Sequence, residues 1–177
     1  ARAYAYHKAA YPDKAEAEAA ALIAKDPKDP YFEEIQGQIL LESGKPQEAL
    51  APLRAATMGS GQNALIATTF GHALIATEDK RNLPEAVKVL KVAVQRDEDN
   101  PFAWVQLGTA YEQLGDEPRA ALATAERASM MGDNRTAIQS ARYAMANLTP
   151  NTSEWIRAQD IAMTSADAAA SSKKKRR

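Results

Sequence analysis

The sequence has no cysteine among its 177 residues, which excludes disulfides and metal sites built on thiolates. Its two histidines, His7 and His72, are far apart, and neither has a glutamate or a second histidine at the spacing of ligands on one helix. A zinc site needs three or four converging ligands, and a His-Glu-x-x-His segment is absent. We therefore expect no metal, no cofactor and no catalytic residue in this chain. The separated histidines do not support a Ser-His-Asp triad either.

Glycine and long apolar runs are also scarce. The eight glycines are scattered, and the densest cluster, Gly59-Ser60-Gly61, lacks the Lys-Ser/Thr pair of a phosphate-binding loop, so we interpret it as a turn. No apolar run approaches the roughly 20 residues that a membrane-spanning helix requires, so no transmembrane segment is expected. The first residues lack a basic stretch followed by an apolar core, so we expect no export signal within this sequence.

A large excess of charge of one sign is missing as well. The formal net charge is −1, of which the last five residues, Lys173 to Arg177, supply +5, so the rest of the chain carries −6. Because a nonspecific nucleic-acid binder needs a positive face, we expect no nucleic-acid partner. The basic end has three explanations: a contact with anionic lipid or nucleic acid, a localisation signal, or an ordinary solvated tail. The last is favoured because such charge runs are usually disordered.

Alanine carries much of the 45% hydrophobic content, and alanine favours helix. The clearest helix runs from Asn100 to Gly115, entered at an Asn-Pro pair and ended near the glycine. Trp104, Leu107, Gly108 and Tyr111 fall three, one and three residues apart, which places them on one face of that helix. This spacing is typical of the first helix of a tetratricopeptide repeat.

The same pattern recurs about every 34 residues. Units that begin at Pro30, Ala64 and Pro101 share one register if three residues are inserted near residues 78–82, where Asn82 is expected to cap the next helix. The eighth position is glycine in each unit, where a side chain would block the close approach of the paired helix, and the twentieth is alanine. These residues are Gly37, Gly71 and Gly108, and Ala49, Ala86 and Ala120.

The register predicts an all-α fold, a right-handed α-solenoid of antiparallel helix pairs with about ten helices. The predicted repeat domain covers residues 1–165, and a disordered basic tail covers residues 166–177. The predicted units are residues 1–29, 30–63, 64–100, 101–134 and an overlapping 118–151, followed by a capping helix over 153–164. Because the first unit starts inside a first helix, we expect the chain to be part of a longer protein.

Three stretches resemble the C-terminal repeat region of bacterial M48-family zinc metallopeptidases, which are exported envelope proteins with a protease domain ahead of the repeats. They are residues 29–44, 102–116 and 155–161. The resemblance implies a periplasmic location and zinc only in a protease domain that is missing here. It also implies docking of substrates, of assembly partners or of the chain's own protease domain. Gln36 departs from the pattern because an apolar residue is usual there, and the first helices lack the Lys and Asn set that clamps a carboxylate.

The predicted function therefore depends on a surface. In repeats of this kind the first helices line a concave face. The predicted partner-binding residues on it are Tyr31, Glu34, Gln38, Glu42, Leu65, Thr68, His72, Phe102, Val105, Thr109 and Glu112. The aromatic and aliphatic members would form an apolar strip for an extended or helical peptide, and packing against neighbouring helices is an equal alternative for each of them. The leading hypothesis is a protein-interaction module of an envelope M48-type metallopeptidase, and the alternative is a stand-alone adaptor.

Overall fold

The computed structural model describes residues 2–175, with side chains through residue 171. These residues form ten α-helices and one short 3-10 helix, and no strand occurs among them. The fold is an all-α solenoid of packed helix pairs, in agreement with the repeat register. It divides into two compact units, the first ending at Asp97 and the second starting at Glu98.

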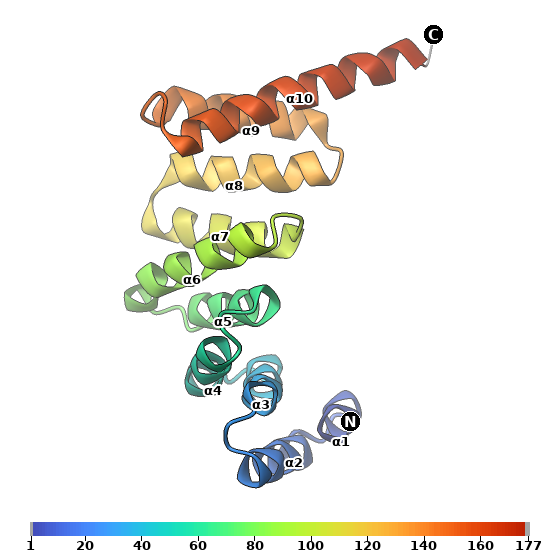
Figure 1. The fold of residues 1–177 in the computed structure, drawn as a ribbon, viewed down its shortest axis with the longest axis vertical. Helices are drawn as coiled ribbons and strands as arrows, with labels where there is room; N and C mark the ends of the chain where they lie inside the picture. Colours follow the sequence, from blue (N-terminus) through green and yellow to red (C-terminus); the bar gives the residue numbers. More distant parts are fainter. Residues whose placement is uncertain (1, 176–177) are drawn as a thin grey trace. The chain divides into compact units, whose positions relative to one another are not determined.

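The first unit contains six α-helices that stack in chain order (Figure 1), and one short 3-10 helix in the loop between the last two. They are α1 (Arg2–Lys8), α2 (Pro12–Lys25), α3 (Pro30–Glu42), α4 (Pro46–Gly59), α5 (Ala64–Ala76), η1 (Lys80–Asn82) and α6 (Leu83–Arg96). Helices α1 and α2, α3 and α4, and α5 and α6 pack as pairs, and α2 on α3 and α4 on α5 join the pairs. Each pair buries its apolar stripe only against its neighbours, as a solenoid requires.

The second unit contains four helices, α7 (Pro101–Leu114), α8 (Glu117–Met130), α9 (Asn134–Asn147) and α10 (Ser153–Lys175). Each helix packs against the next one, and α8 also contacts α10. Alanines form most of the buried core, and every one of Ala137, Ala141 and Ala144 on α9 has no exposed surface. Small side chains let these helices approach closely, and their four-residue and three-residue spacing fixes the buried face of α9.

Local sequence explains where α7 begins and ends. The Asn100 side chain accepts hydrogen bonds from the backbone N–H groups of Phe102 at 3.1 Å and Ala103 at 3.2 Å, and a proline follows at the first helical position. Gly115 ends the helix with φ of 77°, a conformation that glycine adopts without strain. The Trp104 indole N–H donates to the carbonyl of Glu98 at 2.9 Å, which ties the start of the unit to this helix.

The glycines at the eighth repeat position are not equivalent. A Cβ added at Gly71 would lie 2.6 Å from Leu90 Cδ2 and 2.9 Å from Cδ1, and one at Gly37 would lie 2.7 Å from Leu53 Cδ2. At Gly108 the nearest atom would be the Ala123 Cβ at 3.4 Å, an ordinary contact. The predicted close approach is therefore confirmed at the first two glycines and wrong at Gly108, because the facing residue there is alanine rather than leucine.

The loop made longer by the insertion folds into η1. Asp79 caps η1 by accepting the N–H of Arg81 at 3.0 Å. Asn82 occupies the N-cap position of α6, as predicted, but its side chain makes no capping hydrogen bond. Its Nδ2 instead donates to Thr77 Oγ1 at 2.8 Å. The amide thus holds the inserted loop to the end of α5.

The C-terminal helix is longer than the sequence pattern predicts. The expected capping helix over residues 153–164 continues to Lys175, through part of the region expected to be a disordered tail from residue 166. Alanine and serine dominate residues 165–172, and alanine has the highest intrinsic helix propensity, so the helix persists after its apolar contacts end. Arg176 and Arg177 lie outside the described residues. Ala158, Ile161 and Trp155 pack on the apolar cluster of α8 and α9.

Candidate functional site

The predicted partner-binding residues of the first unit lie on α3 and α5, where two large apolar side chains are exposed. Tyr31 at the start of α3 has 54% of its surface exposed, and Leu65 at the start of α5 has 64%. Both lie in the first turn of their helices, two residues after the N-cap residues Asp29 and Asn63. They are available to a partner because the core of each pair is built from the other helix faces.

Two of the polar residues predicted on α3, Gln38 and Glu42, already have partners within the unit. The Tyr4 hydroxyl of α1 donates to the Gln38 side-chain oxygen, and His7 Nε2 of α1 lies 2.6 Å from Glu42 Oε2. Gln38 Nε2 also donates to Glu42 Oε1 at 2.8 Å, so the three contacts form one network. Burial, with the nearby carboxylates of Glu34 and Glu42, raises the pKa of Tyr4. Burial alone raises the pKa of Glu34. In this part of the predicted face, α1 occupies the positions assigned to a partner.

On α5 the predicted residues differ in exposure. Thr68 was expected on the open face, but it is buried, with 2% of its surface exposed, and its hydroxyl donates to the backbone carbonyl of Ala64 at 2.8 Å. It is buried because a threonine on a helix can satisfy its hydroxyl internally and then pack as an apolar group. His72 is half-buried, and this burial lowers its pKa. Leu65 is therefore the predicted residue of α5 that offers most surface.

In the second unit the predicted residues lie on α7 and several of them converge. Phe102 is 47% exposed and Val105 is 39% exposed. Val105, Thr109 and Glu112 line a pocket of about 120 Å³, in which the Thr109 hydroxyl donates to the carbonyl of Val105 at 3.0 Å. The rest of the lining comes from Trp104 and Gly108 of α7 and from Ala123, Thr124 and Arg127 of α8. Its lining combines apolar side chains with two threonines, a carboxylate and a guanidinium.

The repeat pattern did not indicate Arg127 or Thr124 as lining residues. Both lie on α8, the second helix of its pair, whereas the prediction considered first helices alone. Gly108 lines the pocket, and it has no side chain to occupy that space. The signal was present in the sequence, since the repeat register puts Thr124 at the place of Leu53 and Leu90 in the first unit, and threonine is smaller than leucine.

Arg157 of α10 connects three parts of the second unit. Its Nη2 lies 3.0 Å from Glu98 Oε2, and its Nε donates to Glu126 Oε1 of α8. Its guanidinium also lies over the Trp104 ring, 5.1 Å from the centroid. Burial raises the pKa of Glu126, although the Arg157 charge opposes that rise. This network joins α10 to α8 and places the Arg157 guanidinium on Trp104, which also lines the pocket on α7.

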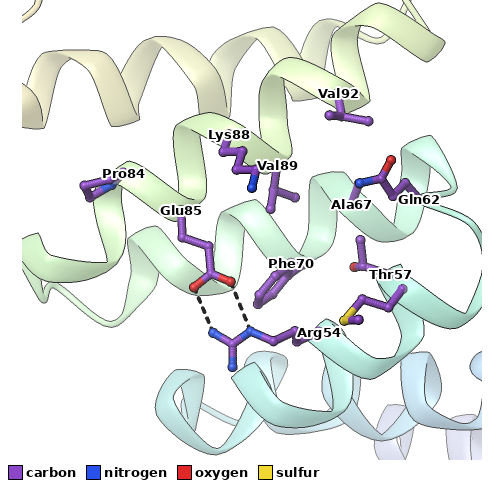
Figure 2. A pocket seen from close by; sticks show the side chains of 11 residues that line it. Arg54, Thr57, Gln62, Ala67, Phe70, Pro84, Glu85, Lys88, Val89 and Val92 are labelled. Carbon is purple, nitrogen blue, oxygen red and sulfur yellow. Dashed lines mark hydrogen bonds and ion pairs between the residues drawn. The ribbon is translucent and has the colours of Figure 1, made fainter.

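A second and larger cavity lies among α4, α5 and α6, and the sequence did not indicate it (Figure 2). Its volume is about 520 Å³. Phe70 of α5 and Val89 and Val92 of α6 supply apolar surface. Arg54 of α4 and Glu85 of α6 lie together at the cavity, with Arg54 Nε and Nη2 donating to the two carboxylate oxygens at 3.0 and 2.8 Å. The one visible hint in the sequence is the pair of valines spaced three residues apart on α6, each directly after a lysine.

Within residues 2–175, no group of three or more acidic or histidine side chains is placed to hold a metal ion. In the same part of the chain, none of the helices combines the length and the hydropathy needed to span a bilayer.

Neither a family model nor a curated protein matches this chain. Among solved structures, it is similar to the crystal structure of MamA, with 17% identity, a TM-score of 0.68 and coverage of 97% of this chain and 96% of that one. It is similar to MamA 41-end from Desulfovibrio magneticus RS-1, with 14% identity, a TM-score of 0.68 and coverage of 96% and 92%. It is also similar to TTC0263, a thermophilic TPR protein of Thermus thermophilus, with 19% identity, a TM-score of 0.54 and coverage of 95% of both chains. The chain therefore shares the helical-repeat fold of a TPR protein.

Proposed function

We propose that this chain is a protein-binding module that holds a segment of another protein against α7 and α8. The observation that carries the proposal is the pocket in which Val105, Thr109 and Glu112 come together. Its volume of about 120 Å³ has room for one apolar side chain, and the exposed Phe102 extends the apolar surface one turn earlier on α7. Glu112 and Arg127 give its lining charges of both signs, which can fix the direction of the bound segment. An exposed apolar surface with a polar rim is typical of such binding sites.

A photo-crosslinking amino acid placed at Thr109 of the full-length protein tests this proposal in cells. We expect covalent adducts with a defined partner from this position. In the matched control the crosslinking amino acid replaces Arg142, an exposed residue of α9, and we expect no adduct from there. Val105→Glu should abolish the Thr109 adduct because it replaces an apolar side chain of the pocket lining with a carboxylate. Equal adducts from both positions, no adduct at Thr109, or an adduct that survives Val105→Glu would each contradict the proposal.

The association with an envelope metallopeptidase belongs to this proposal as its more specific form. The association is supported by the resemblance to the M48 repeat region of residues 29–44, 102–116 and 155–161. The resemblance implies a periplasmic location. It also implies docking of substrates, of assembly partners or of the chain's own protease domain. The alternative, a stand-alone adaptor, accounts equally well for the protein-binding surfaces. The encoding reading frame distinguishes them, because a His-Glu-x-x-His segment ahead of residue 1 supports the first and its absence supports the second. Fractionation of the full-length protein tests the location.

A further inference from the structure

We infer that the cavity among α4, α5 and α6 is a second binding site, which takes an acidic amphipathic peptide segment. Within the first unit, it lies on a different surface from the α3 and α5 residues predicted to meet a partner. Phe70 lies five residues after Leu65 on α5, which places it on the opposite side of the helix from that exposed leucine. The two surfaces can therefore be altered, and can fail, separately.

The size and lining of the cavity suit apolar side chains. A volume of about 520 Å³ lies within the range of ligand-binding sites, which is roughly 300–1,000 Å³. Val89 and Val92 of α6 and Met58 of α4 line it, and Met58 is 74% exposed although it is a large apolar residue. The cavity is open to solvent at these side chains. Two apolar side chains of one helical segment, three or four residues apart, can enter it together.

The Arg54–Glu85 pair closes one part of the cavity and does not compete for a charged ligand. Arg54 donates two hydrogen bonds to Glu85, and its guanidinium lies 5.3 Å from the centroid of the Phe70 ring. Figure 2 shows this pair beside the ring, with Lys88 and Val89 on the neighbouring helix. Because both charges of the pair are satisfied by each other, the pair supplies shape rather than net charge.

The charge that remains beside the cavity is positive. Lys88 lines it, and Lys91 follows three residues later on α6, so both are on neighbouring parts of one helix face. Both side chains are exposed, and within the side chains described through residue 171 neither forms an ion pair. A partner with carboxylates near its apolar side chains would pair with these ammonium groups, whereas a basic partner would be repelled. Charge complementarity therefore selects an acidic amphipathic segment.

Selection from a phage-displayed library of random 12-residue peptides on the full chain tests the inference. We expect enrichment of peptides that carry Asp or Glu close to two large apolar residues. The enriched peptides should bind Lys88→Glu/Lys91→Glu about tenfold more weakly or worse, as measured by fluorescence anisotropy, because attraction becomes repulsion. The matched control is Lys25→Glu/Lys28→Glu, which makes the same change of net charge at exposed sites in the same unit. Its affinity for the enriched peptides should stay within about twofold of that of the original chain.

Two further variants locate the bound peptide. Val89→Trp should abolish binding by filling the cavity, with circular dichroism to show that the variant is folded, and Val105→Glu on α7 should leave binding unchanged. Selection repeated on Lys88→Glu/Lys91→Glu should enrich basic peptides instead. The inference is wrong if no acidic apolar peptides are enriched, if the two charge-reversed variants weaken binding equally, or if Val105→Glu abolishes it. The last result would place the peptides on the α7 pocket and would support the proposed function while removing this second site.

Discussion

Replacing Gly71 with alanine should destabilise the protein, whereas the same replacement at Gly108 should stabilise it. Both glycines are buried and lie inside helices at the same repeat position. A Cβ at Gly71 would meet Leu90 at 2.6 and 2.9 Å, and Leu90 has no exposed surface, so its side chain cannot move aside into solvent. At Gly108 the nearest atom is the Ala123 Cβ at 3.4 Å, which leaves room for a methyl group.

The magnitudes follow from two opposing terms. Glycine in a helix interior costs roughly 0.5–1 kcal/mol relative to alanine, so each substitution gains about that amount. Overpacking a buried site costs about 1–3 kcal/mol, and this term applies at Gly71 alone. We expect Gly108→Ala to raise the free energy of unfolding by about 0.5–1 kcal/mol and Gly71→Ala to lower it by about 0.5–2 kcal/mol. Helix propensity alone would predict the same gain at both sites.

Urea unfolding followed by circular dichroism measures both variants against the original chain. A double-mutant cycle with Leu90→Ala identifies the cause of the loss at Gly71. Leu90→Ala alone should cost about 2–5 kcal/mol, and in the Gly71→Ala background it should cost less because the new methyl group fills part of the space that leucine leaves. Equal stability of Gly71→Ala and Gly108→Ala, or strict additivity of Gly71→Ala with Leu90→Ala, would refute the reasoning.

Three more predictions concern the second unit. Arg157→Met should lower the free energy of unfolding by about 2 kcal/mol at neutral pH by leaving the Glu126 carboxylate buried without its partner. The raised pKa of Glu126 means that folding favours its protonated form. The loss of stability caused by Arg157→Met should therefore shrink as the pH falls. Adding Glu126→Gln to Arg157→Met should reduce the same loss at neutral pH. Burial raises the pKa of Tyr111 to about 12. Between about pH 10 and pH 12 this tyrosine ionises in the unfolded chain before it does in the folded one, so the free energy of unfolding should fall over that range. Unfolding curves of Tyr111→Phe at alkaline pH should show a shallower fall. Asn100→Ala should cost about 1 kcal/mol in thermal unfolding by removing the cap of α7, and Asn100→Asp should retain most of the stability because its carboxylate can accept the same bonds.

The two cavities differ in volume and in the charge of the residues that line them. The pocket on α7 is small and includes a carboxylate and a guanidinium, so it can bind one side chain and orient the chain that carries it. The cavity among α4, α5 and α6 is more than four times larger by volume, and its unpaired charge is positive.

The sequence by itself determined the class of fold. Apolar residues at three-residue and four-residue spacing, proline near helix starts and the recurring glycine and alanine positions were enough to place the helix pairs, because each repeat is stabilised by local and nearest-neighbour contacts. The exposed positions of Tyr31, Leu65, Phe102 and Val105 followed from the same register. These features depend on helix periodicity alone, which a sequence carries directly.

Tertiary structure decided everything that depends on which side chain faces a given position. Gly71 and Gly108 share one repeat position, yet the first meets a leucine and the second an alanine, so one is tightly packed and the other borders a pocket. Thr68 lies in the predicted register but is buried, and Gln38 is bonded to Tyr4 from a helix 34 residues earlier in the chain. The cavity beside Phe70 arises from the distances among three helices. The periodicity of a sequence indicates which face of a helix points inward. The space between two packed helices depends on the facing side chains of both helices, and only the tertiary structure brings those side chains together.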